Sequence, residues 1–108
     1  MQNWTKDYFM SYLMFYAAMT DHKITEEERE LITDNFDADV VKASEKEISN
    51  DNDAQRLDKI SNYVQSNDLS QSDIDFLLEQ MKEMYSADGK FDSVEKGTLM
   101  ILSQILKA

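Results

Sequence analysis

The sequence predicts an all-α fold: a compact single-domain bundle of about six helices that spans residues 1–108. The chain has the length of one domain. Proline is absent and glycine occurs only at Gly89 and Gly97, whereas a β-sandwich or barrel of this size would need more turn residues. Hydrophobic residues make up 42% of the chain, enough for one packed core, and they recur at helical spacing.

The first helix is expected over residues 5–19, where aromatic side chains recur every three or four positions. This run lacks the positive flank of a signal peptide and is shorter than the roughly 20 residues that cross a bilayer. We therefore expect a core helix of a cytoplasmic protein with no membrane insertion. A second helix is expected to begin at Thr25, which can form a capping box with Glu28. Its inward residues would be Leu31 and Ile32.

Three more helices are expected in the middle of the chain. The third follows Asp37 as its N-cap, and the polar stretch 49–53 separates it from the fourth, because Asn and Asp side chains compete with the helical backbone. Ser70 is expected to cap the fifth, with Asp73 at the third helical position. Their apolar stripes would face the core: Val40, Val41, Ile48, then Leu57, Ile60, Tyr63, Val64, then Ile74, Leu77, Leu78, Met81, Met84 and Tyr85.

The last helix is expected to open at Asp92 and Glu95 and to be apolar on more than one face. That pattern is typical of a helix packed between others. Gly97 in its first turns costs about 1 kcal/mol relative to alanine, and we expect it to admit a neighbouring helix at close range. Most of the seven methionines are expected to fill the core, although an exposed Met-rich groove would suit a partner helix.

The excess of acidic residues limits the classes of partner that the protein can bind. The chain carries 22 acidic and 11 basic residues, a net charge of −11, which disfavours binding to nucleic acid. Such a field attracts divalent cations or basic protein surfaces. Cysteine is absent, which excludes disulfides and thiol chemistry, and His22 is the only histidine. The sequence has no phosphate-binding loop, nucleophile elbow or zinc-protease motif, so we do not expect an enzyme.

Two segments of the chain share a pattern. Asp21–Arg29 (DHKITEEER) and Asp88–Lys96 (DGKFDSVEK) both read Asp-x-Lys-apolar-cap-x-x-Glu-basic. Each follows an aromatic, Met-rich helix and opens another, which predicts an approximate internal twofold repeat. Helix capping by Thr25 and Asp92 accounts for most of the pattern. A shared carboxylate site for a cation is the alternative, because hard cations need several convergent oxygens.

The second copy also matches the last eight positions of an EF-hand loop. In that register the first two side-chain ligands would fall at Met84 and Ser86, within a continuous helical pattern. Methionine cannot bind calcium, and the first copy would place Ala17 and Met19 there. We therefore do not expect an EF-hand.

Residues 85–96 (YSADGKFDSVEK) resemble the Ala-Asp-Gly-x-apolar-x-x-x-Glu signature of tellurite-resistance TerB-like domains, which the N-terminal domain of the co-chaperone DjlA shares. Residues 21–28 look like the family's first copy, although Thr20 and His22 stand where Ala and Gly are usual. The resemblance implies a compact all-α domain with two neighbouring acidic turns and an association with stress responses. It also implies a divalent cation, calcium or another, on the family's acidic positions: Asp21, Glu28, Asp88 and Glu95.

Two hypotheses for function follow. The first is a non-enzymatic acidic interaction module that binds a protein partner and a divalent cation through the two acidic turns. The alternative is a small acidic inhibitor or immunity-type protein that masks a basic surface, with its charge speeding association.

Overall fold

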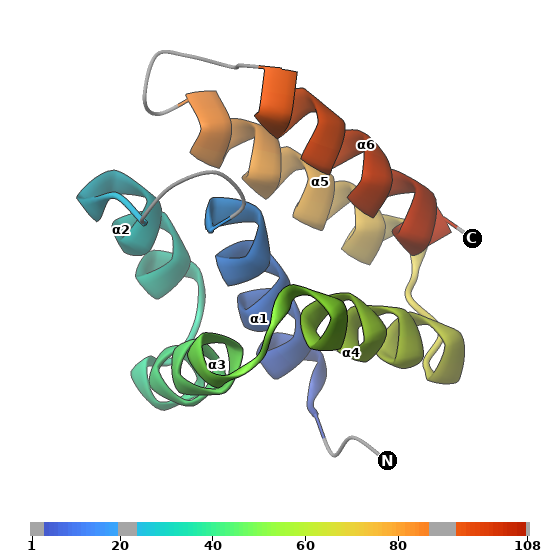
Figure 1. The fold of residues 1–108 in the computed structure, drawn as a ribbon, viewed down its shortest axis with the longest axis horizontal. Helices are drawn as coiled ribbons and strands as arrows, with labels where there is room; N and C mark the ends of the chain where they lie inside the picture. The colour runs from blue at the N-terminus through green and yellow to red at the C-terminus, as the bar shows by residue number, and fades with distance from the viewer. Residues whose placement is uncertain (1–3, 20–23, 87–92, 108) are drawn as a thin grey trace.

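Six helices make up the part of the chain that the computed structural model describes, which is residues 4–19, 24–86 and 93–107 (Figure 1). These ranges contain no strand, so the all-α prediction is confirmed. The Cα radius of gyration, 12.8 Å, is that of one domain of this length. The helices are α1 (Lys6–Ala18), α2 (Glu26–Asn35), α3 (Ala38–Asn50), α4 (Asp53–Ser66), α5 (Gln71–Ser86) and α6 (Ser93–Lys107).

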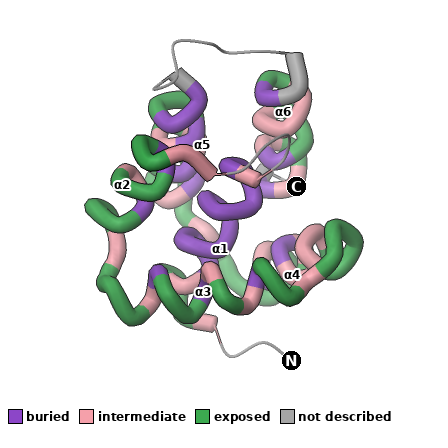
Figure 2. Tube along the Cα trace, turned by 60° about the vertical axis from the view of Figure 1, so that its left-hand side comes forward, coloured by how far each residue is buried: buried purple, intermediate pink, exposed green. Residues whose placement is uncertain are grey.

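Helix α1 is the centre of the bundle. Every residue from Phe9 to Ala18 is buried, and α1 contacts each of the other five helices (Figure 2). The one polar residue in this run, Ser11, shares a 2.7 Å hydrogen bond with the buried Ser44 of α3, so its hydroxyl is satisfied. No helix in the described ranges is long and apolar enough to cross a membrane.

Short polar side chains start most of the helices, as the sequence predicts. Thr25 and Glu28 form the expected capping box at α2, and Ser70 and Asp73 exchange the equivalent two bonds at α5. Asp37 occupies the N-cap of α3, but its side chain makes no capping hydrogen bond. The polar stretch before α4 holds a capping box that the sequence analysis did not identify, between Asn52 and Gln55.

The core follows the predicted stripes. The fully buried aliphatic residues include Ile32 of α2, Ile48 of α3, Ile60 of α4 and Leu77 of α5. Four methionines also fill the interior, as expected: Met10, Met14, Met81 and Met84. Leu31 and Val64 are only partly buried and pack against the edge of this core.

Helix α6 follows its prediction only in part. It packs against α1, α4 and α5 and buries Leu102 and Leu106, but Met100 is 59% exposed and Ile101 is 50% exposed. A Cβ placed on Gly97 would meet no atom within 4 Å, so the expected close approach of a neighbouring helix is wrong. The reason is positional: α1 occupies the centre, and α6 lies outside it against α1, α4 and α5.

Candidate functional site

The structure describes two of the four predicted site residues, Glu28 and Glu95. Glu28 lies in the first turn of α2 and Glu95 in the first turn of α6. Asp21 and Asp88, together with Thr20 and His22, lie outside the described residues. The cap residue Asp92, which the sequence pairs with Glu95, lies outside them as well.

Glu28 has a defined local role. Its Oε1 accepts a 2.9 Å hydrogen bond from the backbone N–H of Thr25, and its own N–H donates to Thr25 Oγ1 at 3.2 Å. Carboxylates in a first helical turn also interact favourably with the positive end of the helix dipole. Helix capping therefore contributes to holding Glu28 in place.

Burial separates the two glutamates from the other acidic residues. Glu28 is 0% exposed and Glu95 is 2% exposed, and they are the only buried charged residues among the side chains that the structure describes. Both stand at the third position of the helix that follows a core helix. The chain thus buries the last acidic residue of each repeated segment and leaves its other described acids accessible.

The helices that precede the two acidic turns meet at their C-terminal ends. The hydroxyl of Tyr85, at the end of α5, donates a 3.0 Å hydrogen bond to the carbonyl oxygen of Ala17, at the end of α1. Tyr85 is 1% exposed, and α1 packs along α5. The segments that carry Asp21 and Asp88 therefore follow helix ends that lie close together.

The described residues do not by themselves form a metal centre. No group of three or more His, Asp or Glu side chains gathers within the described ranges. The predicted continuous helix before the second copy is confirmed, because α5 continues through Ser86 and buries Met84 completely. Any cation site at the repeat would need the oxygens of Asp21 and Asp88 beside those of Glu28 and Glu95.

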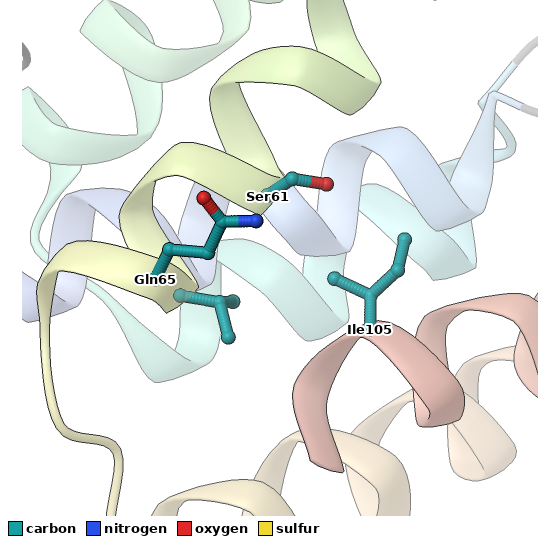
Figure 3. A pocket seen from close by; sticks show the side chains of 4 residues that line it. Ser61, Gln65 and Ile105 are labelled. Atoms are coloured by element: carbon teal, nitrogen blue, oxygen red, sulfur yellow. The ribbon is translucent and has the colours of Figure 1, made fainter. Parts of the chain in front are cut away.

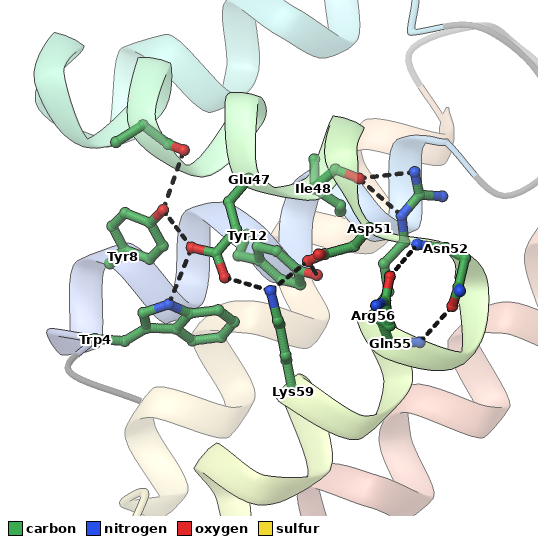
Figure 4. A network of polar contacts seen from close by, with 11 residues as sticks. Trp4, Tyr8, Tyr12, Glu47, Ile48, Asp51, Asn52, Gln55, Arg56 and Lys59 are labelled. Carbon is green, nitrogen blue, oxygen red and sulfur yellow. Dashed lines mark hydrogen bonds and ion pairs between the residues drawn. The ribbon is translucent and has the colours of Figure 1, made fainter. Parts of the chain in front are cut away.

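A polar network joins α1, α3 and α4, and the sequence analysis did not find it (Figure 4). Tyr8 donates to Glu47 Oε1 at 2.7 Å, and Tyr12 donates to Asp51 Oδ2 at 2.7 Å. Lys59 Nζ lies 2.8 Å from both Glu47 Oε2 and Asp51 Oδ2, so one ammonium group bridges the two carboxylates. The available signal was spacing: the tyrosines and the acids each recur four residues apart, which aligns two helix stripes.

The pKa shifts in this network keep its tyrosines protonated and its Asp51 ionised. Burial, reinforced by the hydrogen bond to Glu47 or Asp51, raises the pKa of the Tyr8 and Tyr12 phenols above the ordinary value. Burial and the charge of Asp53 raise the pKa of Tyr16 to about 12. Burial opposes ionisation of Asp51, but hydrogen bonds from Lys59 and Tyr12 outweigh it and lower the pKa of that carboxyl. The tyrosines therefore remain donors and Asp51 an acceptor, which fastens α1 to α3 and α4.

Comparisons with known protein families, characterised proteins and solved structures find no match for this chain. The resemblance to TerB-like domains accordingly remains a prediction that rests on the motif in residues 85–96 and its earlier copy.

Proposed function

We propose that this protein is a non-enzymatic acidic interaction module in which the two repeated acidic turns bind a divalent cation. One observation carries the proposal. Among the charged side chains that the structure describes, the only two that are buried are Glu28 and Glu95, the corresponding glutamates of the two repeated segments.

Helix capping does not require this burial. A capping glutamate needs only to reach the backbone N–H of its N-cap, which a side chain at the surface does equally well. Removing a carboxylate from water costs free energy unless hydrogen bonds, an opposite charge or a metal ion compensates. A cation shared by the two acidic segments would add to the compensation that hydrogen bonds such as Thr25 N–H to Glu28 Oε1 already give.

The placement of the two preceding helix ends supports a shared site. The Tyr85–Ala17 hydrogen bond holds together the ends of α1 and α5. Asp21 follows Ala17 by four residues and Asp88 follows Tyr85 by three, so each acid is only a few residues along the chain from this contact. Asp21 and Asp88 would complete the oxygen ligands that Glu28 and Glu95 begin.

Calorimetric titration of chelator-treated protein with calcium, magnesium, manganese and zinc tests the proposal. We expect one ion to bind per chain, and the Asp21→Asn/Asp88→Asn double variant to bind it at least about tenfold more weakly, because two ligands are lost. The matched control is Asp34→Asn/Asp39→Asn, which removes the same charge from exposed positions of α2 and α3. Equal, weak binding by all three proteins would contradict the cation site.

A second candidate function has its own support in the surface charge. With a net charge of −11, the protein suits an inhibitor that covers a basic surface of its partner, such as the nucleic-acid cleft of a nuclease. In that case recovery of a basic partner from cell lysate should be insensitive to chelator and should survive moderate salt. Loss of every basic partner in mild salt would argue against the inhibitor.

A further inference from the structure

A groove between α4 and α6 shares no lining residue with the polar network of α1, α3 and α4. It has a volume of about 340 Å³ and is lined by Ser61, Val64 and Gln65 of α4 and by Ile105 of α6. Figure 3 shows Ile105 pointing from α6 toward Ser61, with Gln65 at the margin. The facing aliphatic groups of Val64 and Ile105 are only partly buried, so this pair of helices leaves apolar surface accessible.

The accessible apolar surface continues along α6. Gly97, Ile101 and Ile105 recur every four residues and therefore lie on one side of the helix, which we call the α6 stripe. Ile101 is 50% exposed, and the space in front of Gly97 is open. The fold gains nothing from glycine there, because glycine in a helix costs about 1 kcal/mol relative to alanine.

The arrangement of the helices leaves room along this stripe. Figures 1 and 2 both show the N-terminal end of α6 lying farther from α4 than its C-terminal end does. Gly97 belongs to the N-terminal half of α6, and Ile101 lies near its middle. Ile105 belongs both to the groove and to the α6 stripe, so the stripe adjoins the groove at this residue. A helix lying there could bring its backbone close to α6 at Gly97, where no side chain intervenes.

The negative charge near the groove favours a basic binding partner over an acidic one. Exposed Asp58 precedes Ser61 by three residues and Gln65 by seven, so it lies on the α4 side of the groove. Among the described side chains, no basic residue lines the groove itself. A second copy of this chain would bring another net charge of −11 and be repelled, whereas a segment rich in Lys and Arg would be attracted.

We propose that the groove between α4 and α6 docks an amphipathic helix of a partner protein. The apolar face of that helix would cover the α6 stripe, and its Lys or Arg side chains would lie beside Asp58. This is the familiar mode in which apolar anchors at helical spacing enter a groove. The inference rests on the proposed role as an interaction module, but it does not require the cation site.

The test uses an 18-residue helical peptide of leucine and lysine, with a leucine and glutamate peptide of the same apolar face as its control. Titration of the full ¹⁵N-labelled chain in the presence of chelator should move the amide signals of Ser61, Gln65, Ile101 and Ile105 together. We expect the lysine peptide to bind at least about tenfold more tightly than the glutamate peptide at low salt. Asp58→Asn should weaken binding a few-fold.

Gly97→Leu is the decisive variant. A Cβ at this position meets no atom within 4 Å, so we expect the fold to persist while the docking surface is blocked, and peptide binding to weaken at least about tenfold. Ser72→Leu adds the same side chain to an exposed position of α5 and should leave binding unchanged. Ile101→Ser gives a second test that removes apolar contact instead of adding bulk.

Three results would overturn the inference. Signal changes spread over the whole acidic surface and unaltered by Gly97→Leu would mean diffuse attraction. Equal affinity for the lysine and glutamate peptides would show that the groove does not prefer a basic partner. Dimers that Gly97→Leu dissociates would assign the groove to a second copy. None of these results would bear on the cation titration of the Asp21 and Asp88 variants, because the peptide is titrated in the presence of chelator.

Discussion

Helices α1 and α6 are the two most apolar helices of the chain, yet the fold uses them differently. From Phe9 to Ala18, α1 has no exposed residue, because five helices surround it. Helix α6 buries Leu102 and Leu106 but leaves Met100 59% exposed and Ile101 50% exposed. The apolar residues of α1 are thus accounted for by folding, whereas part of the apolar surface of α6 is available for another molecule.

The largest expected effect is a difference in the free energy of unfolding between a truncation in α1 and a truncation in α6. Phe15→Ala should lower the free energy of unfolding by about 3–5 kcal/mol, because Phe15 is 0% exposed and truncation would leave a cavity at the centre. Ile101→Ala should change it by less than about 0.5 kcal/mol. Urea denaturation of both variants measures the difference. Similar losses in the two variants would mean that α6 is as much a part of the core as α1.

A smaller effect is expected where α1 is fastened to α3. Tyr12→Phe removes the hydrogen bond to Asp51 and should cost about 1.5–3 kcal/mol at neutral pH, the range for bonds to charged groups. Because the folded-state pKa of Asp51 lies below the ordinary value of 3.8, this contribution is complete above that pH and is lost as the pH falls through the folded pKa.

Urea denaturation of wild type and Tyr12→Phe between pH 7 and pH 2 checks this dependence. The two stability curves should converge in acid, as Asp51 takes up a proton in the folded protein. A gap that stays constant, or widens, as the pH falls would show that the hydroxyl of Tyr12 does not act through the Asp51 carboxylate.

The smallest expected effect is a gain in stability, and it comes from a substitution in α6. Gly97→Ala should raise the free energy of unfolding by roughly 0.5–1 kcal/mol, since alanine is the better helix former and its methyl group meets no atom. Thermal unfolding would register this as a higher midpoint. A lower midpoint would indicate that the position is crowded, contrary to the open surface on which the docking groove depends.

Local features of this fold could be predicted from sequence, and tertiary ones could not. The capping box of Thr25 and Glu28, the cap at Ser70 and the buried stripe of α5 all arise within a few residues of chain, where spacing determines contact. The central position of α1 and the open side of α6 depend on which helices surround each one, and periodicity within one helix carries no such information.

The same division holds for the candidate site. Sequence spacing identified Glu28 and Glu95 as equivalent positions, but not their burial, which depends on the packing of α2 and α6 onto the bundle. The bridge from Lys59 to Glu47 and Asp51 was not predicted, because acids twelve and eight residues before a lysine meet it only after α3 and α4 pack together.

Titration of the Gly97→Leu variant with the leucine and lysine peptide tests most directly whether the spare apolar surface of α6 serves binding and not folding. The account predicts a protein that unfolds no more easily than wild type and binds the peptide at least about tenfold more weakly. Undiminished binding by a correctly folded variant would contradict it, because the peptide would then be held somewhere other than the α6 stripe.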